Sequence, residues 1–353
     1  MEFLVSYALF LAKAITFIAV VLMGIILAKG AKGGEVKGKL KVTNLSKKYQ
    51  RIKEAITSEL YDKNQLKLQG KLKKKQAKAE KKAQSKTDKK LKKDLDASLL
   101  TQRDPRIFVL DFKGSIDAKE VVSLREEVSA ILSVAHCDDE VVLRLETGGG
   151  MVHGYGLAAS QLQRLRDAKI PLTIAVDKVA ASGGYMMACV GNKIISAPFA
   201  IVGSIGVVAQ LPNFNKLLKK HDIEYEQLTA GEFKRTLTMF GENTDTAREK
   251  FRQELDETHT LFKDFIHKNR PALDLPKVAT GEHWFGTQAE ELGLVDKIQT
   301  SDDYLMQACA KKEVLKITYV QPKSLSEKLG HIGANILDKS LLKLLERGQK
   351  PLL

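Results

Sequence analysis

The chain has 353 residues, a formal net charge of +14 and 44% hydrophobic side chains. Residues 31–100 hold 22 Lys and Arg against 8 Asp and Glu, whereas residues 101–353 hold 33 basic and 34 acidic side chains. This composition excludes a wholly disordered chain and a nucleic-acid binder that is basic throughout. The three cysteines, Cys137, Cys189 and Cys309, form no CxxC and no zinc-type spacing, so neither a disulfide framework nor a metal site is predicted.

The first segment of the chain is apolar enough to cross a bilayer. Residues 3–28 carry one charged side chain, Lys13, and about 20 apolar residues suffice for a membrane-spanning helix. A cleaved signal peptide is the alternative, but the chain begins Met-Glu-Phe and shows no basic start or small-residue cleavage site. We therefore expect a retained transmembrane anchor over residues 1–30.

The basic arm, residues 31–104, has the composition of a solvated, partly helical spacer. It is rich in Lys, Gln and Ala, with sparse apolar positions. Attraction to anionic lipid headgroups is the functional alternative, because the arm follows the anchor directly. Nucleic-acid binding is disfavoured because no aromatic side chains interleave the lysines of residues 71–86 to stack on bases.

From Pro105 onward, strand-like and helix-like segments alternate. Strands are expected at 107–112, 141–145, 172–176, 193–197 and 204–210. Helices are expected after a capping-box-like Asp117 and Glu120, and at 155–168, 185–190 and 244–269. The alternation predicts βαβ units and a mainly parallel sheet, an α/β domain over residues 105–310 with a C-terminal extension over 311–353. The last helix carries an apolar stripe typical of core or subunit contact, formed by Phe251, Leu255, Phe262 and Ile266.

Two glycine-rich turns follow predicted strands, at residues 148–150 and 183–184. Neither matches a phosphate-binding glycine motif, so an oxyanion hole and a surface for an extended peptide are the favoured uses. Ser182 lies between a strand end and a helix start. There it is either a nucleophile on a sharp turn or an ordinary N-cap serine, and spacing alone leaves both readings open.

Four motifs in this order resemble those of the SppA/SohB family of membrane peptidases. They are Ala180-Ala-Ser-Gly-Gly-Tyr185, Val202-Gly-Ser-Ile-Gly-Val207, Ala230-Gly-Glu-Phe-Lys234, and Gly286-Thr-Gln-Ala289 followed by Gly293-Leu-Val-Asp296. The resemblance implies a Clp-protease/crotonase-like fold and a homo-oligomer. It also implies a serine endopeptidase that cleaves extended or membrane-released peptides, such as signal-peptide remnants, with a Ser–Lys dyad and no cofactor.

The resemblance also assigns the site residues. It makes Ser182 the nucleophile, Lys234 the general base and Ser204 the residue that orients this lysine. The N–H of Gly183, with that of Gly149 or Gly150, would form the oxyanion hole. One departure is the segment Glu146-Thr-Gly-Gly-Gly150, where the family has Asn-Ser-Pro-Gly-Gly, and it leaves the geometry of the substrate strand open.

A lysine base imposes a physical requirement. Lysine at its reference pKa of about 10.4 is protonated at pH 7, so a general-base lysine needs an apolar, desolvated site. We expect this burial to come from subunit packing, with serine and lysine supplied by neighbouring chains. A histidine-based site is the rival chemistry, and His153, just after the glycine turn, is the best placed histidine for it.

Membrane orientation and function class retain alternatives. The lysines after residue 28 favour a cytoplasmic body, whereas the family resemblance implies the periplasmic side of a bacterial inner membrane, which we favour. A crotonase-type acyl-CoA enzyme and a non-catalytic membrane scaffold are the other function classes.

Overall fold

The computed structural model describes residues 38–61 and 103–321, together with Tyr7, Phe10, Leu11, Lys13, Ala14, Thr16 and Phe17. Most of the expected anchor and arm, and the chain after residue 321, lie outside the described residues. Among the described residues, no helix has the length and apolar character needed to span a membrane.

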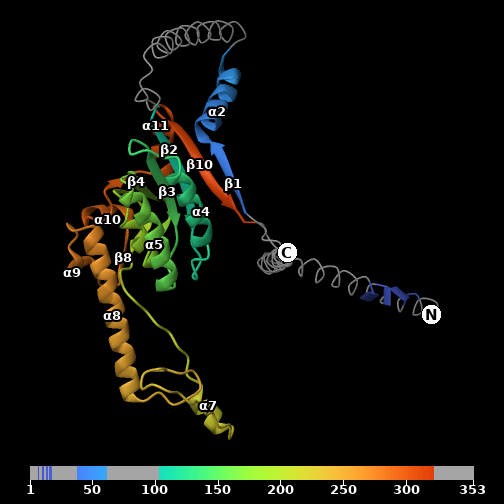
Figure 1. Cartoon of the computed structure of the whole chain (residues 1–353), viewed down its shortest axis with the longest axis vertical. Coiled ribbons are helices and arrows are strands. Elements are labelled where there is room, and N and C mark those ends of the chain that lie inside the picture. Colours follow the sequence, from blue (N-terminus) through green and yellow to red (C-terminus); the bar gives the residue numbers. More distant parts are fainter. Residues whose placement is uncertain are drawn as a thin grey trace, which may run out of the picture. The chain divides into compact units, whose positions relative to one another are not determined.

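A seven-stranded sheet forms the centre of the described domain (Figure 1). In spatial order its strands are β1 (Lys39–Asn44), β10 (Glu313–Val320), β2 (Arg106–Lys113), β3 (Glu140–Glu146), β4 (Leu172–Val176), β6 (Lys193–Ser196) and β9 (Lys297–Ile298). The pairs from β10 to β9 are all parallel. The predicted α/β class with a mainly parallel sheet is therefore confirmed.

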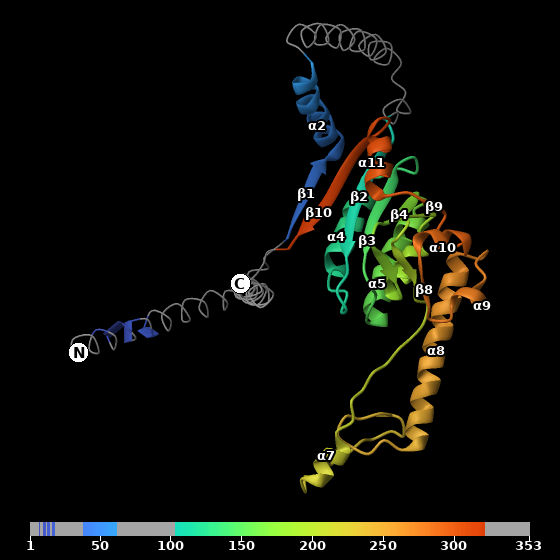
Figure 2. The same cartoon turned by 180° about the vertical axis from the view of Figure 1, so that it is seen from behind.

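Helices cover both faces of this sheet (Figures 1 and 2). Helices α4 (Val121–Leu132) and α5 (Val152–Asp167) pack on the face to which Phe108, Leu110 and Phe112 point. Helices α2 (Leu45–Leu60) and α11 (Ser301–Cys309) pack on the other face, over residues such as Ile107 and Val109. Because successive strand residues point to opposite faces, strands buried on both sides read as continuous apolar runs.

Two strands of the sheet come from outside the range 105–310 that the sequence predicts for the domain. Strand β10 lies in the expected C-terminal extension and pairs with β2, with Val314 opposite Ile107. Strand β1 and helix α2 lie in the expected arm, and Leu45 at the start of α2 is buried. Pairing between segments so distant in sequence leaves no local signal, so composition alone does not predict that these two segments join the sheet.

Two local predictions are wrong. The carboxylate of Asp117 does not cap α4, which begins without a side-chain cap; Asp117 and Glu120 instead both accept hydrogen bonds from the Ser115 hydroxyl, at 2.6 and 2.8 Å. The strand expected at 204–210 is also absent, since β7 (Ile201–Gly203) ends before it. The positive φ angles of Gly203 (+102°) and Ser204 (+52°) interrupt the extended backbone there.

A second, three-stranded sheet stands beside the first. It has the order β5 (Val179–Ala181), β7 and β8 (His283–Phe285), with β7 parallel to β5 and antiparallel to β8. Three short helices flank these strands. Helix α6 (Gly183–Ala188) follows β5, α9 (Leu275–Val278) comes before β8, and α10 (Gly286–Glu291) follows β8.

Helix α8 (Asp245–Asn269) links the body to a projecting segment, residues 207–244, which includes α7 (Asn215–Lys220). Figures 1 and 2 show this segment at the end of α8 away from the sheets. The predicted apolar stripe on α8 is buried only near the body, at Phe262 and Ile266. Phe251 and Leu255, nearer the projecting segment, are half-buried.

Candidate active site

Three neighbouring chain segments bring the glycine turn and both candidate serines to one place. Thr147 pairs with Ala180, and Ala181 pairs with Gly203, all in parallel register. The Ser182 N–H donates to the Gly203 carbonyl at 2.8 Å. Continuing these registers by one or two residues sets Gly149, Ser182 and Ser204 side by side at the strand ends.

Ser182 has the backbone of a sharp turn rather than of an N-cap. Its φ and ψ are +52° and −117°, and its side chain makes no capping hydrogen bond to α6. The residue is half-buried, and its hydroxyl has no hydrogen-bond partner among the described residues. A serine held at positive φ costs about 1–3 kcal/mol, so the surrounding pairing must enforce this geometry. A serine on a strained turn between a strand and a helix has the local geometry that the nucleophile prediction requires.

Ser204 also has a positive φ angle, directly after the adjacent strand β7. Its φ is also +52°, and its N–H donates to the Glu282 carbonyl at 2.6 Å. Ser204 is half-buried, and its hydroxyl likewise has no partner within the described part of the chain. Two serine hydroxyls thus lie on neighbouring strand ends, both free to bind a third group.

Gly183 opens α6, so its N–H belongs to the first helical turn and has no intrahelical acceptor. A Cβ at this position would lie 2.4 Å from the ring of Tyr155, a fully buried residue of α5. The Tyr155 hydroxyl donates to the Ser115 carbonyl at 2.8 Å and shares a short hydrogen bond with the Thr147 hydroxyl. Burial raises the pKa of Tyr155, which keeps this supporting phenol neutral.

The sequence prediction missed this role of Tyr155. The sequence feature that could have indicated this role is an aromatic residue about one helical turn after the glycine turn, on the buried face of α5.

The glycine turn packs tightly against its neighbours. Gly149 has φ +88°, and a Cβ there would lie 2.7 Å from the Gly183 nitrogen and 2.8 Å from the Ser182 Cβ. A Cβ at Gly150 would lie 2.1 Å from the Ile116 carbonyl oxygen. The Gly149 N–H donates to the Thr147 hydroxyl at 3.2 Å, whereas the Gly150 N–H has no partner among the described residues. Only glycine fits both positions.

Glu146, which stands where the family has asparagine, bridges two lysines. Lys113 at the end of β2 lies 3.0 Å from its carboxylate, and Lys178 before β5 lies 3.4 Å from it. The hydrogen bond from Lys113, supported by that from Lys178, lowers the pKa of Glu146. Glu146 thus holds together the strand ends that lead into the site.

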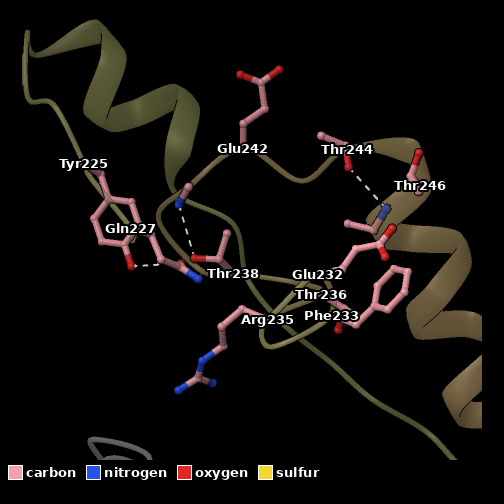
Figure 3. Close-up of a pocket in the computed structure, with 12 residues that line it drawn as sticks. Tyr225, Gln227, Glu232, Phe233, Arg235, Thr236, Thr238, Glu242, Thr244 and Thr246 are labelled. Carbon is pink, nitrogen blue, oxygen red and sulfur yellow. Dashed lines mark hydrogen bonds between the residues drawn. The ribbon is translucent and has the colours of Figure 1, made fainter. Parts of the chain in front are cut away.

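Lys234 is not brought to Ser182 within one chain. It is exposed in the projecting segment, where its N–H donates to the Gly231 carbonyl at 3.2 Å. Its neighbours Glu232, Phe233 and Arg235 line a cavity of about 430 Å³ at the start of α8, but Lys234 does not (Figure 3). A single chain therefore gives this lysine no apolar burial.

The remaining candidates have ordinary surroundings. His153 is exposed in the first turn of α5. The carboxylate of Asp177 accepts from the N–H of Ser301 at 2.8 Å and so caps α11. The Tyr185 hydroxyl donates to the Leu294 carbonyl at 3.0 Å. The described residues contain no group of three or more His, Cys, Asp or Glu side chains placed to hold a metal ion.

Comparison with known proteins gives consistent matches. Residues 2–162 match the family model described as Peptidase family S49 N-terminal, and residues 164–315 match Peptidase family S49. The chain is 49% identical over 331 residues to "Probable protease SohB" of Haemophilus influenzae, covering 93% of this chain and 92% of that protein. It is 53% identical over 348 residues to the protein of the same name from Buchnera aphidicola subsp. Acyrthosiphon pisum, covering 98% of each.

Proposed function

Because the chain belongs to peptidase family S49, we propose that it is a serine endopeptidase that uses Ser182 as nucleophile and Lys234 as general base. Membership confirms the family that the motif series resembles. The observation that carries the finer proposal is the strained Ser182, with its hydroxyl unpartnered among the described residues and the free N–H of Gly183 beside it. Extended or membrane-released peptides are the proposed substrates, since the glycine-lined strand ends suit an added peptide strand.

The proposed reaction is acyl transfer. Neutral Lys234 Nζ takes the proton of Ser182 Oγ as this oxygen attacks the scissile carbonyl carbon. The N–H of Gly183 and one N–H of the glycine turn donate to the oxyanion that forms. The lysine ammonium then gives its proton to the leaving amine, and water hydrolyses the acyl-enzyme with the lysine again acting as base. Ser204, beside Ser182, would hold the lysine amine in line.

This chemistry requires a second copy of the chain. A general-base lysine needs desolvation, and one chain leaves Lys234 exposed in the projecting segment. We therefore place the Lys234 of one copy at the Ser182 of its neighbour, in a homo-oligomer. The oligomer is proposed to sit at a bacterial inner membrane, held by one N-terminal span, with its catalytic side in the periplasm. The apolar run over residues 3–28 supports the span.

Hydrolysis of a fluorogenic peptide panel by the detergent-solubilised protein tests the dyad. Lys234→Ala is expected to lower kcat/KM by at least about 10³-fold, because the proposed mechanism has no other base to activate the serine. His153→Ala, a change at an exposed residue of α5, is expected to stay within about twofold of wild type. The reverse pattern, loss with His153→Ala and activity with Lys234→Ala, would assign the site to a histidine base.

Mixing two inactive variants tests the shared site. If serine and lysine come from different copies, equal mixing of Ser182→Ala and Lys234→Ala chains leaves about a quarter of the sites with both wild-type residues. We therefore expect about a quarter of wild-type activity after co-expression of the two variants. Background activity in oligomers shown to contain both chains would mean that each chain supplies its own pair.

A further inference from the structure

One face of helix α2 is apolar along its whole length but is buried only at its start. That face holds Leu45, Tyr49, Ile52, Ile56 and Leu60, which are three or four residues apart. Leu45 is 8% exposed, and Tyr49 packs beside it against the core. The exposed fraction then rises along the helix, to 46% at Ile52, 56% at Ile56 and 74% at Leu60. We call these last three residues the α2 stripe, an apolar row that water alone would cover poorly.

The chain leaves α2 at its far end and comes back to its start. Figures 1 and 2 show the far end standing away from the sheets, and α2 stops there because Tyr61 has extended φ and ψ of −115° and 140°. At the near end, the N-cap residue Asn44 donates to the Glu313 carboxylate at 2.9 Å, and Arg106 of β2 lies 3.3 Å from the same carboxylate. Residues 62–102, outside the described residues, therefore connect the two ends of α2, which lie about 24 Å apart in a helix of 16 residues.

The last part of this connection carries a matching apolar row. Residues 88–100 read Asp-Lys-Lys-Leu-Lys-Lys-Asp-Leu-Asp-Ala-Ser-Leu-Leu, with no glycine or proline. Leu91, Leu95 and Leu99 are four residues apart, the same spacing as in the α2 stripe, so they would share one side of a helix. Lysines and aspartates fill most of the other positions, as expected of a helix with one side in water.

We propose that residues 91–99 form a helix that packs antiparallel against the α2 stripe. The facing pairs are Leu91 with Leu60, Leu95 with Ile56 and Leu99 with Ile52. The antiparallel direction follows from the two ends of the connection, since the chain starts beyond Leu60 and must reach Arg106 beside the start of α2. Ile52 lies about 10 Å along α2 from Leu45, a distance that the chain from Leu99 to Arg106 covers without being fully extended.

A segment of the same chain is favoured over other occupants by its tether. Both ends of residues 62–102 are held next to α2, so the leucine row meets the stripe at a high effective concentration. The pairing turns the basic arm into a helical hairpin that is fixed to the body at both ends. The lysines of residues 71–86 then lie at the closed end of this hairpin, beyond Tyr61, and form one basic surface.

Disulfide formation within one chain tests the contact. In the full-length, detergent-solubilised protein with Cys137→Ser and Cys309→Ala, Ile56→Cys is combined with Leu95→Cys. Residues that face each other across two packed helices can bring their Cα atoms to the distance of about 4.4–6.8 Å that a disulfide needs. Mild oxidation is expected to link most chains internally, as measured by mass spectrometry of the linked peptides.

A matched control uses Ser58→Cys in place of Ile56→Cys. Ser58 is exposed two residues along α2, on the nearly opposite side, and its hydroxyl donates back to the Ala55 carbonyl at 2.6 Å. At least about tenfold less internal disulfide with Leu95→Cys is expected from this position. Equal linking from both positions would overturn the inference. Links between chains in place of internal links would assign the stripe to a second copy and overturn it as well.

Tryptic cleavage of the full-length protein without cysteine changes gives a second readout. Ile56→Asp is expected to raise the rate of cleavage after Lys92 and Lys93 by at least about tenfold, because a docked helix is cut only when it opens. Ser58→Asp should leave this rate unchanged, and an equal rate in wild type and Ile56→Asp would contradict the docking. An Ile56→Cys thiol that only anionic vesicles shield from a water-soluble maleimide would assign the stripe to a bilayer instead. None of these measurements depends on Ser182 or on peptide hydrolysis.

Discussion

Ser182→Ala is expected to lower kcat/KM for peptide hydrolysis by at least about 10⁴-fold, since removing the proposed nucleophile leaves only binding and oxyanion stabilisation. Stability should change little, because the Ser182 hydroxyl has no hydrogen-bond partner among the described residues and alanine keeps the Cβ. The free energy of unfolding is expected to stay within about 0.5 kcal/mol of wild type. Fluorogenic peptides and thermal unfolding measure the two quantities on the same preparation.

Ser160→Ala serves as the control for this experiment. Ser160 is an exposed serine of α5 whose hydroxyl donates to the Gly156 carbonyl at 2.8 Å, far along the helix from the glycine turn. It should leave kcat/KM unchanged. Peptide hydrolysis that survives Ser182→Ala would refute the nucleophile. If the same variant also hydrolysed acyl-CoA thioesters at the wild-type rate, the shared fold would be serving crotonase-type chemistry instead.

The elements of the central domain could be predicted because each carries its own pattern. Strands β2 and β3 each carry a buried apolar run that ends before Asp111 and Arg144, and β4 is buried along its whole length, as expected of strands covered on both faces. The helices between them show one buried face. The predictions that failed depend on contacts between segments distant in sequence or on backbone dihedral angles. No local pattern reports that Val314 lies opposite Ile107, and an apolar run after Gly203 reads as a strand until positive φ angles end it.

The candidate site likewise includes features that the sequence predicts and features that it does not. The sequence pattern predicted Ser182 on a turn but left its role open, and its φ and ψ angles then showed that it lacks an ordinary N-cap conformation. Tyr155 was not foreseen, because its contact with Gly183 crosses from one helix to the start of another. The relation of Lys234 to Ser182 stays a proposal, since the projecting segment makes its side-chain contacts with itself and with the first turns of α8.

The departure at Glu146 is explained by what its carboxylate binds. An anionic side chain two residues before the glycine turn would repel a substrate carbonyl if it pointed into the site. Instead it pairs with Lys113 and Lys178, which come from the ends of two other chain segments. The substitution therefore changes how the strand ends are tied together, while the turn itself still offers unsubstituted glycine backbone to a peptide.

Gly149→Ala is expected to lower kcat/KM by at least about 10²-fold, although the residue carries no functional side chain. A methyl group there would lie 2.7 Å from the Gly183 nitrogen and 2.8 Å from both the Ala181 oxygen and the Ser182 Cβ. Because two of these atoms are backbone, the serine turn itself must move, and a shift of about 1 Å at a catalytic group costs about that factor. The φ of +88° adds strain, so stability should fall by about 1–3 kcal/mol.

Gly148→Ala gives this prediction its control, because the two glycines are neighbours in one turn. A Cβ at Gly148 meets no atom within 4 Å, and its backbone is not in the left-handed region. The variant should therefore keep kcat/KM within about threefold of wild type and unfold at the same temperature. Equal losses in the two variants would mean that a side chain anywhere in the turn blocks the binding of substrate. Loss at Gly149 alone would mean that its contact with Ser182 and Gly183 sets the geometry of the nucleophile.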